Sequence, residues 1–235
     1  MNANLLKEVE DIHTRTFGQG ARTIGVTSPQ TQSGVSTLAK SLAKRCASSG
    51  QKALLMDISR EADDPFVPNE ADLIGKTSNG QEIWRTSEGY DILALNPAKG
   101  DQYGFRDARE LQEMLKSELE GYQQIVVDLP QVPNTDNAPV PGSVLESAPN
   151  GVGAAACDAV VLVCRTYAVT RAAIETAVKN LTKNDAKIAG LVMNDQNAPT
   201  LQQEMLKEFS RKKWFLPKSI RRYLEKKSSP HRSHH

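Results

Sequence analysis

The sequence has no long apolar run, few aromatic residues and only three cysteines. A membrane-spanning helix needs about 20 consecutive apolar residues, and no segment approaches that length. The polar N-terminus also lacks the pattern of a secretory signal peptide. We therefore expect a cytoplasmic protein, which can also act at the inner face of the cell membrane.

The cysteines exclude a disulfide framework and a cysteine-based metal site. Cys46, Cys157 and Cys164 are odd in number and have no metal-ligand spacing. Cys46 falls in a predicted helix and Cys164 in a predicted strand, so we predict buried free thiols, with a redox role as the alternative. Such thiols fit a reducing compartment.

A net charge of +1 gives no general attraction to nucleic acid, but the charge is unevenly distributed. Residues 211–235 hold nine Lys/Arg and one acidic residue, whereas the rest of the chain holds 20 basic and 27 acidic residues. We predict one α/β domain over 1–210 and a basic amphipathic tail over 211–235.

Within the tail, Arg211–Lys227 combines basic residues with an apolar helical face and nearby aromatic residues. This pattern suits anionic lipid or an acidic partner surface. The alternative is that its apolar groups only cover the last strand. Nucleic-acid binding is the weaker hypothesis, because no DNA-reading module accompanies the charge.

Short apolar runs alternate with amphipathic stretches, which is typical of an α/β sheet. Strands are predicted at Thr23–Thr27, Lys52–Ile58, Asp91–Leu95, Gln124–Val127, Asp158–Cys164 and Ile188–Met193. Helices are predicted at Met1–Phe17, Ser36–Ser49, Asp107–Glu120 and Thr170–Leu181. Right-handed crossovers then give a doubly wound, mostly parallel sheet with helices on both faces. No element is predicted in the polar stretch Glu61–Gly89 or in the Pro/Asn/Gly-rich stretch Pro130–Gly153.

Ile24–Ala39 contains a strand, a tight turn and a helix start, in the order that a nucleotide phosphate loop requires. An ordinary loop has Gly-Lys-Ser/Thr where this chain has Gly34-Val35-Ser36. The lysine that contacts the β- and γ-phosphates is therefore absent. Backbone N–H groups from Gln32 to Thr37 and the helix N-terminus can still hold an anion.

Two aspartates each follow an apolar run that we predict to be a strand. Asp57 and Asp128 should therefore lie at the carboxyl ends of their strands, at the same edge of the sheet as the turn. A carboxylate there can hold Mg²⁺ or orient an attacking oxygen, and Ser36 can supply a hydroxyl to the metal. The alternative is that each aspartate only caps a loop.

Taken in order, these segments resemble the bacterial tyrosine kinases, which belong to the MinD/ParA-like P-loop proteins. The similar segments are Thr27–Ala39, Leu54–Asp57, Ile125–Pro130, Asp158–Val163 and Ile188–Asn194. The resemblance implies ATP or ADP with Mg²⁺ as the ligand, and an inner-membrane polysaccharide copolymerase or export component as the partner. It also implies that Asn194 meets the adenine.

The residue pattern and the resemblance to bacterial tyrosine kinases together define a candidate site. Asp57 and Asp128 are the candidate catalytic residues, and Ser36, Asp57 and Asp128 are the candidate metal ligands. The candidate nucleotide-binding residues are Gln32, Ser33, Gly34, Val35, Ser36, Thr37 and Asn194.

The chain also departs from the pattern of these kinases. Besides Val35, Gln30 occupies the position of a second, signature lysine, and no second carboxylate follows Asp57 two residues on. The C-terminal tyrosine cluster is absent, since Tyr223 stands alone. The Glu/Arg motif used for ring assembly is not recognisable in Glu8–Arg15, although a homo-oligomer remains among the expected partners.

The absence of the lysine should weaken nucleotide binding less than it slows catalysis. A charge-assisted hydrogen bond contributes about 1.5–3 kcal/mol, so its loss weakens nucleotide binding by roughly one to two decades. Phosphoryl transfer relies on positioned charge and should lose about 10²–10³-fold. Lys40 and Lys44 are poor substitutes, because even Lys40 lies more than one helical turn beyond Val35.

We therefore expect an accessory or regulatory protein of exopolysaccharide biosynthesis and export, such as that of a capsule or holdfast. In this hypothesis it resembles the kinase half of a polysaccharide copolymerase and is catalytically impaired. One alternative is an active, atypical tyrosine kinase or ATPase. Another is a MinD-like positioning protein at the membrane surface.

Overall fold

A computed structural model describes residues 3–58, 71–77, 80–94, 108–132 and 151–195. Nearly all of these residues belong to one compact unit, Met1–Asn194. The predicted tail, residues 211–235, and the predicted domain boundary at residue 210 lie outside the described residues.

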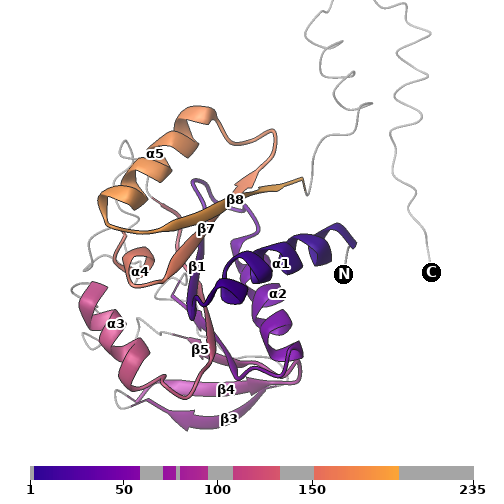
Figure 1. The fold of residues 1–235 in the computed structure, drawn as a ribbon, viewed down its shortest axis with the longest axis vertical. Coiled ribbons are helices and arrows are strands. Elements are labelled where there is room, and N and C mark those ends of the chain that lie inside the picture. Colours follow the sequence, from indigo (N-terminus) through magenta and orange to yellow (C-terminus); the bar gives the residue numbers. More distant parts are fainter. Residues whose placement is uncertain (1–2, 59–70, 78–79, 95–107, 133–150, 196–235) are drawn as a thin grey trace, which may run out of the picture. The chain divides into compact units, whose positions relative to one another are not determined.

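One sheet organises the unit (Figure 1). Its strands are β1 (Thr23–Thr27), β2 (Ala53–Asp57), β3 (Ala71–Lys76), β4 (Glu82–Thr86), β5 (Asp91–Ala94), β6 (Gln124–Asp128), β7 (Ala159–Arg165) and β8 (Ile188–Asn194). Their order across the sheet is β3-β4-β5-β2-β6-β1-β7-β8. Neighbours pair in parallel from β5 to β8, and β3 and β4 are antiparallel additions. The predicted doubly wound, mostly parallel α/β fold is confirmed.

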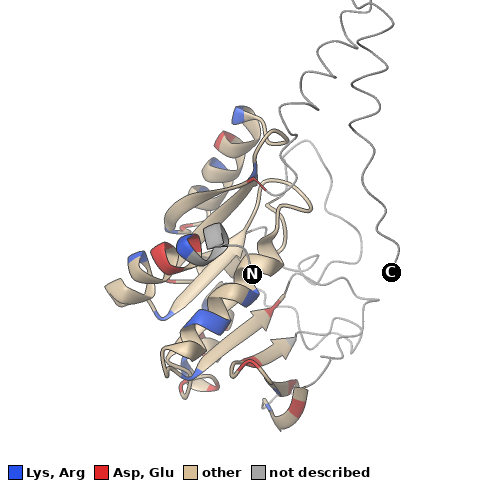
Figure 2. Ribbon diagram, turned by 90° about the vertical axis from the view of Figure 1, so that its right-hand side faces the viewer, with Lys and Arg blue, Asp and Glu red and all other residues tan. Residues whose placement is uncertain are grey.

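Helices cover both faces of the sheet. They are α1 (Ala3–Arg15), the short 3-10 helix η1 (Phe17–Gln19), α2 (Val35–Ser48), α3 (Ala108–Ser117), α4 (Val152–Ala155) and α5 (Arg171–Lys183). Alternate strand residues face opposite sides, which gives two apolar clusters. The first includes Leu38 and Leu42 of α2, and the second includes Leu111 of α3 and Leu181 of α5. Charged residues lie mainly on the helices and at strand ends (Figure 2).

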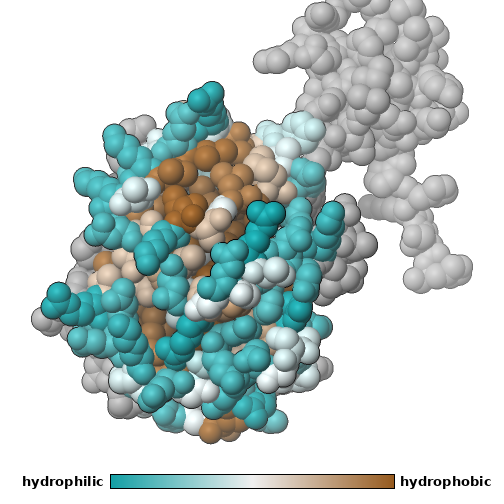
Figure 3. Space-filling model, in the orientation of Figure 1, coloured by the Kyte–Doolittle hydropathy of each residue, from teal (hydrophilic) through white to brown (hydrophobic). Residues whose placement is uncertain are grey.

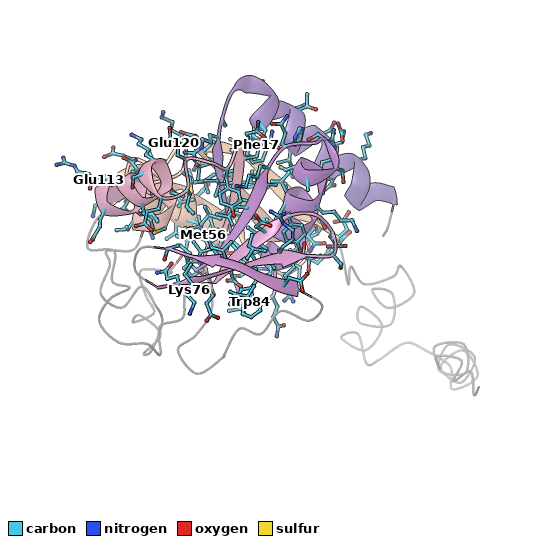
Figure 4. The ribbon with its side chains drawn as sticks, turned by 90° about the horizontal axis from the view of Figure 1, so that it is seen from below. Phe17, Met56, Lys76, Trp84, Glu113 and Glu120 are labelled. Atoms are coloured by element: carbon cyan, nitrogen blue, oxygen red, sulfur yellow. The ribbon has the colours of Figure 1, made fainter. Side chains whose placement is uncertain are left out.

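The hairpin β3–β4 was missed in the sequence. Its first strand is almost wholly exposed and contains Asp72 and Lys76, so it has no buried apolar run to mark it. A register shift after Leu73 further breaks the alternation. Figure 4 shows Lys76 and Trp84 on this outer hairpin, while Met56 lies in the interior of the unit. The short helix α4 was missed because it has only four residues, at the end of a stretch rich in Pro, Asn and Gly.

The amino ends of the central strands are held by side-chain hydrogen bonds. Asp158 accepts from the backbone N–H groups of Arg22 and Thr23, each at 2.9 Å. The Arg22 guanidinium donates to the carbonyls of Leu115, at 3.0 Å, and of Leu119, just beyond α3. A basic side chain at this end of a helix satisfies carbonyls that have no partner within the helix.

The edge strand β8 carries an exposed apolar surface. Leu191 and Met193 are each 42% exposed, and apolar atoms gather over β8 and α5 in Figure 3. Among the helices that the structure describes, none combines the length and apolar character needed to cross a bilayer.

The prediction of buried free thiols is confirmed, because Cys46, Cys157 and Cys164 are all free and buried. Burial raises the pKa of Cys46 to about 12 and also raises the pKa of the other two thiols. We therefore expect the native protein to react with a thiol-specific colorimetric reagent at pH 8 far more slowly than the unfolded chain. In denaturant, all three should react. A thiol that reacts at once in the native state would contradict the burial.

Candidate nucleotide site

The segment between β1 and α2 has an irregular backbone that its sequence explains only in part. Gly34 has a φ of 90° and forms the N-cap of α2, a conformation that glycine adopts without strain. Gln32 also lies in the left-handed region, at a φ of 55°. For a residue with a side chain, that conformation costs about 1–2 kcal/mol. The loop therefore needs other contacts to hold it.

Some of these contacts come from within the loop. The hydroxyls of Ser28 and Ser33 both donate to the Gln30 carbonyl, the second at 2.8 Å. Ser33 is buried, which explains why a small hydroxyl residue suits this position.

The first half of the loop is tied to the chain that follows β6. Thr27 Oγ1 donates to the Pro130 carbonyl at 2.6 Å, and Gln131 Nε2 donates to the Pro29 carbonyl at 3.1 Å. A backbone bond of 2.9 Å joins Val132 N–H to the Ser28 carbonyl. Sequence reasoning did not identify these contacts, because the partners are about a hundred residues apart.

The second half of the loop opens into α2. Ser36 and Thr37 are exposed there, and the first intrahelical bond runs from Leu38 N–H to the Gly34 carbonyl, at 3.0 Å. The preceding N–H groups have no acceptor within the helix and carry the positive end of its dipole. This helix end can attract an anion such as a phosphate group.

Asp57 and Asp128 are the last residues of β2 and β6, as predicted, and they pair in register on adjacent parallel strands. Both are buried, at 5% and 1% exposure. By strand alternation they share a face with Leu55 and Val126, which belong to the α2-side cluster. The structure therefore brings both carboxylates together on the face that α2 covers.

Val35 begins α2 and packs, half-buried, against the same apolar cluster. An ordinary phosphate loop has a lysine at this position, whereas this chain has an apolar side chain that packs against the core. Lys44 does not replace that amine, because it forms an ion pair with Glu88. Lys40 lies one turn before Lys44 on α2, and its side chain is exposed.

Asn194 ends β8 and reaches the loop directly. Its Nδ2 donates to the Ser33 carbonyl at 2.8 Å. A Cβ atom added at Gly34 would lie only 2.6 Å from the same Nδ2, so the side chain packs closely against the loop backbone. Asn194 was predicted as a nucleotide-binding residue, and the structure places it against other members of the predicted set.

The donor set fits a magnesium nucleotide. Within the described part of the chain, no group of three or more His, Cys, Asp and Glu side chains could hold a metal alone. Mg²⁺ commonly takes one or two carboxylates and completes its shell with water and phosphate oxygens. Asp57 and Asp128 would supply the carboxylates, and the exposed Ser36 hydroxyl would supply a further oxygen.

Comparison with known proteins supports the fold. No family model and no curated sequence matches the chain. Among solved structures, the kinase domain of VpsO is 18% identical with a TM-score of 0.59, covering 81% of this chain and 95% of its own. The kinase domain of the Escherichia coli tyrosine kinase ETK is 18% identical with a TM-score of 0.56, covering 79% and 71%.

The septum site-determining protein MinD from Pyrococcus horikoshii, complexed with Mg-ADP, is 17% identical with a TM-score of 0.51, covering 75% and 71%. The predicted resemblance is confirmed at the level of fold: this chain has the α/β P-loop fold of bacterial tyrosine kinase domains and MinD. The roles of its site residues stay predictions.

Proposed function

We propose that the protein is an accessory, nucleotide-responsive member of an exopolysaccharide biosynthesis and export system. It resembles the kinase half of a polysaccharide copolymerase, binds Mg-ADP or Mg-ATP weakly and transfers phosphate poorly. The observation that carries this proposal is the combination of two buried carboxylates, Asp57 and Asp128, beside a phosphate-type loop whose lysine position holds Val35.

The proposed site keeps groups that bind a nucleotide but lacks a group that phosphoryl transfer needs. The α2 N-terminus and the loop N–H groups attract the phosphates, and the carboxylates hold Mg²⁺ directly or through water. Bound Mg²⁺ would neutralise phosphate charge. With Val35, no amine compensates the charge that develops during phosphoryl transfer, so the transition state loses more stabilisation than the bound nucleotide.

Calorimetric titration with ADP, with and without Mg²⁺, tests the site. If an ordinary loop binds in the micromolar range, a loss of one to two decades gives a Kd of about 10–100 μM. Asp128→Asn should remove most of the Mg²⁺ dependence, whereas Asp72→Asn, at an exposed position on β3, should not. Absence of Mg-ADP binding at millimolar concentration would rule out a nucleotide-responsive role.

A second candidate is an active, atypical tyrosine kinase or ATPase. It is favoured by the presence of both Asp57 and Asp128 in register at the strand ends. ATP turnover by the wild type that disappears in Asp57→Ala and Asp128→Ala would support this candidate and remove the proposal of an impaired site.

The pathway and the partner rest on the resemblance to tyrosine kinases. Disrupting the gene should lower the amount of surface exopolysaccharide, and the protein should bind an inner-membrane copolymerase or export component. Anionic lipid binding through Arg211–Lys227 without such a partner would instead favour a MinD-like role at the membrane.

A further inference from the structure

The end of the edge strand β8 is joined to the phosphate-type loop by one side chain. Asn194 Nδ2 donates to the Ser33 carbonyl at 2.8 Å, across a sequence separation of 161 residues. A Cβ atom added at Gly34 would lie 2.6 Å from the same Nδ2, so the Asn194 side chain would have to shift. Asn194 therefore contacts the backbone of the loop itself, and the contact forms without any ligand.

The contact acts where the loop needs support. Ser33 lies between Gln32 and Gly34, which both have positive φ angles. The anchors described above hold Ser28 and Pro29, in the first half of the loop, to residues after β6. Asn194 holds the second half, immediately before α2 begins.

The hydrogen bond from Asn194 fixes the orientation of the peptide group between Ser33 and Gly34. A trans peptide points its C=O and its N–H in opposite directions. Holding the Ser33 carbonyl toward β8 therefore turns the Gly34 N–H away from β8. In the sheet order, β6 and β2 lie on the other side of β1 from β8, and they end in Asp128 and Asp57.

We propose that Asn194 is a positioning residue that fixes the peptide group between Ser33 and Gly34, so that the Gly34 N–H faces the side where the two carboxylates lie. This role differs from a contact with the adenine, which the resemblance implies for the same residue. The inference rests on the proposed nucleotide site for its functional consequence, but the hydrogen bond acts on the loop without any ligand.

The variant Asn194→Asp tests this role in the full chain. It keeps the size of the side chain but replaces the donor with an oxygen that repels the Ser33 carbonyl. Met193→Ala is the matched control, because Met193 is the neighbouring residue on β8 and is exposed. Without ligand, amide hydrogen exchange over residues 30–38 should become at least about threefold faster in Asn194→Asp and stay unchanged in Met193→Ala.

Ligand titration separates positioning from base recognition. Mg-ADP has a base, and Mg-pyrophosphate has only the phosphates. For this titration we use Asn194→Leu, which has a similar size but neither the donor nor the negative charge that would repel phosphate. A positioning role predicts that Asn194→Leu weakens both by a similar factor, about threefold to tenfold, as expected for one hydrogen bond. Loss of ADP affinity alone, with unchanged exchange in the loop, would assign Asn194 to the base and overturn the proposal.

The two proposals can fail separately. If the wild type binds neither probe, the proposed nucleotide function fails, and the exchange measurement still decides the role of Asn194. If the wild type binds both probes, but Asn194→Asp does not change exchange and Asn194→Leu does not change affinity, the positioning role fails while the nucleotide function stands.

Discussion

Replacing Val35 with lysine should tighten Mg-ADP binding about 10- to 100-fold. The lysine would place its ammonium group beside the phosphates, and a charge-assisted hydrogen bond contributes about 1.5–3 kcal/mol. The backbone should accept the change, because Val35 is the first residue of α2 and only half-buried. The aliphatic part of a lysine can cover the same apolar cluster while its amine reaches the loop.

Parallel titrations of the wild type, Val35→Lys and Val35→Met provide the measurement. Methionine offers a long, uncharged side chain, so it should leave the affinity within about threefold of the wild type. The gain in the lysine variant should also shrink as salt is raised, since it is electrostatic. Equal micromolar affinity of the wild type and Val35→Lys would mean that the missing amine does not limit binding.

The central part of the fold could be predicted from the sequence because burial marks it. Residues 53–57 and 125–128 are continuous apolar runs that end in aspartate, and both became central parallel strands with the carboxylates in register. Such a pattern identifies a strand that is covered on both faces. The positions of Asp57 and Asp128 therefore followed from the sequence, whereas their chemical roles did not.

The rest depended on features that the sequence does not display locally. The hairpin β3–β4 is largely exposed, so its residues have no strong apolar pattern. The hydrogen bond between Asn194 and Ser33 joins residues 161 positions apart, and only the assembled sheet brings them together. The resemblance predicted Asn194 as part of the site, but it did not predict a contact with the loop itself.

Replacing Arg85 with alanine should lower the free energy of unfolding by about 3 kcal/mol. Its guanidinium contacts Asp91 twice, with Nε–Oδ1 at 2.7 Å and Nη2–Oδ2 at 3.0 Å, and the Asp91 side chain is only 2% exposed. Tyr122 donates to the same carboxylate at 2.9 Å. Removing one member of a buried pair typically costs about 3–5 kcal/mol, and the half-exposed position of Arg85 places the effect at the lower end.

A second arginine in the chain provides the matched control. Arg171 contacts Glu175 at the same distance, 2.7 Å, but these side chains are 91% and 61% exposed. Its replacement by alanine should change stability by less than about 0.5 kcal/mol in urea unfolding. Because Asp91 begins β5, at the opposite end of the sheet from Asp57 and Asp128, Arg85→Ala should leave Mg-ADP affinity unchanged where the protein is folded. Equal losses in the two variants would show that burial of the carboxylate does not govern the effect.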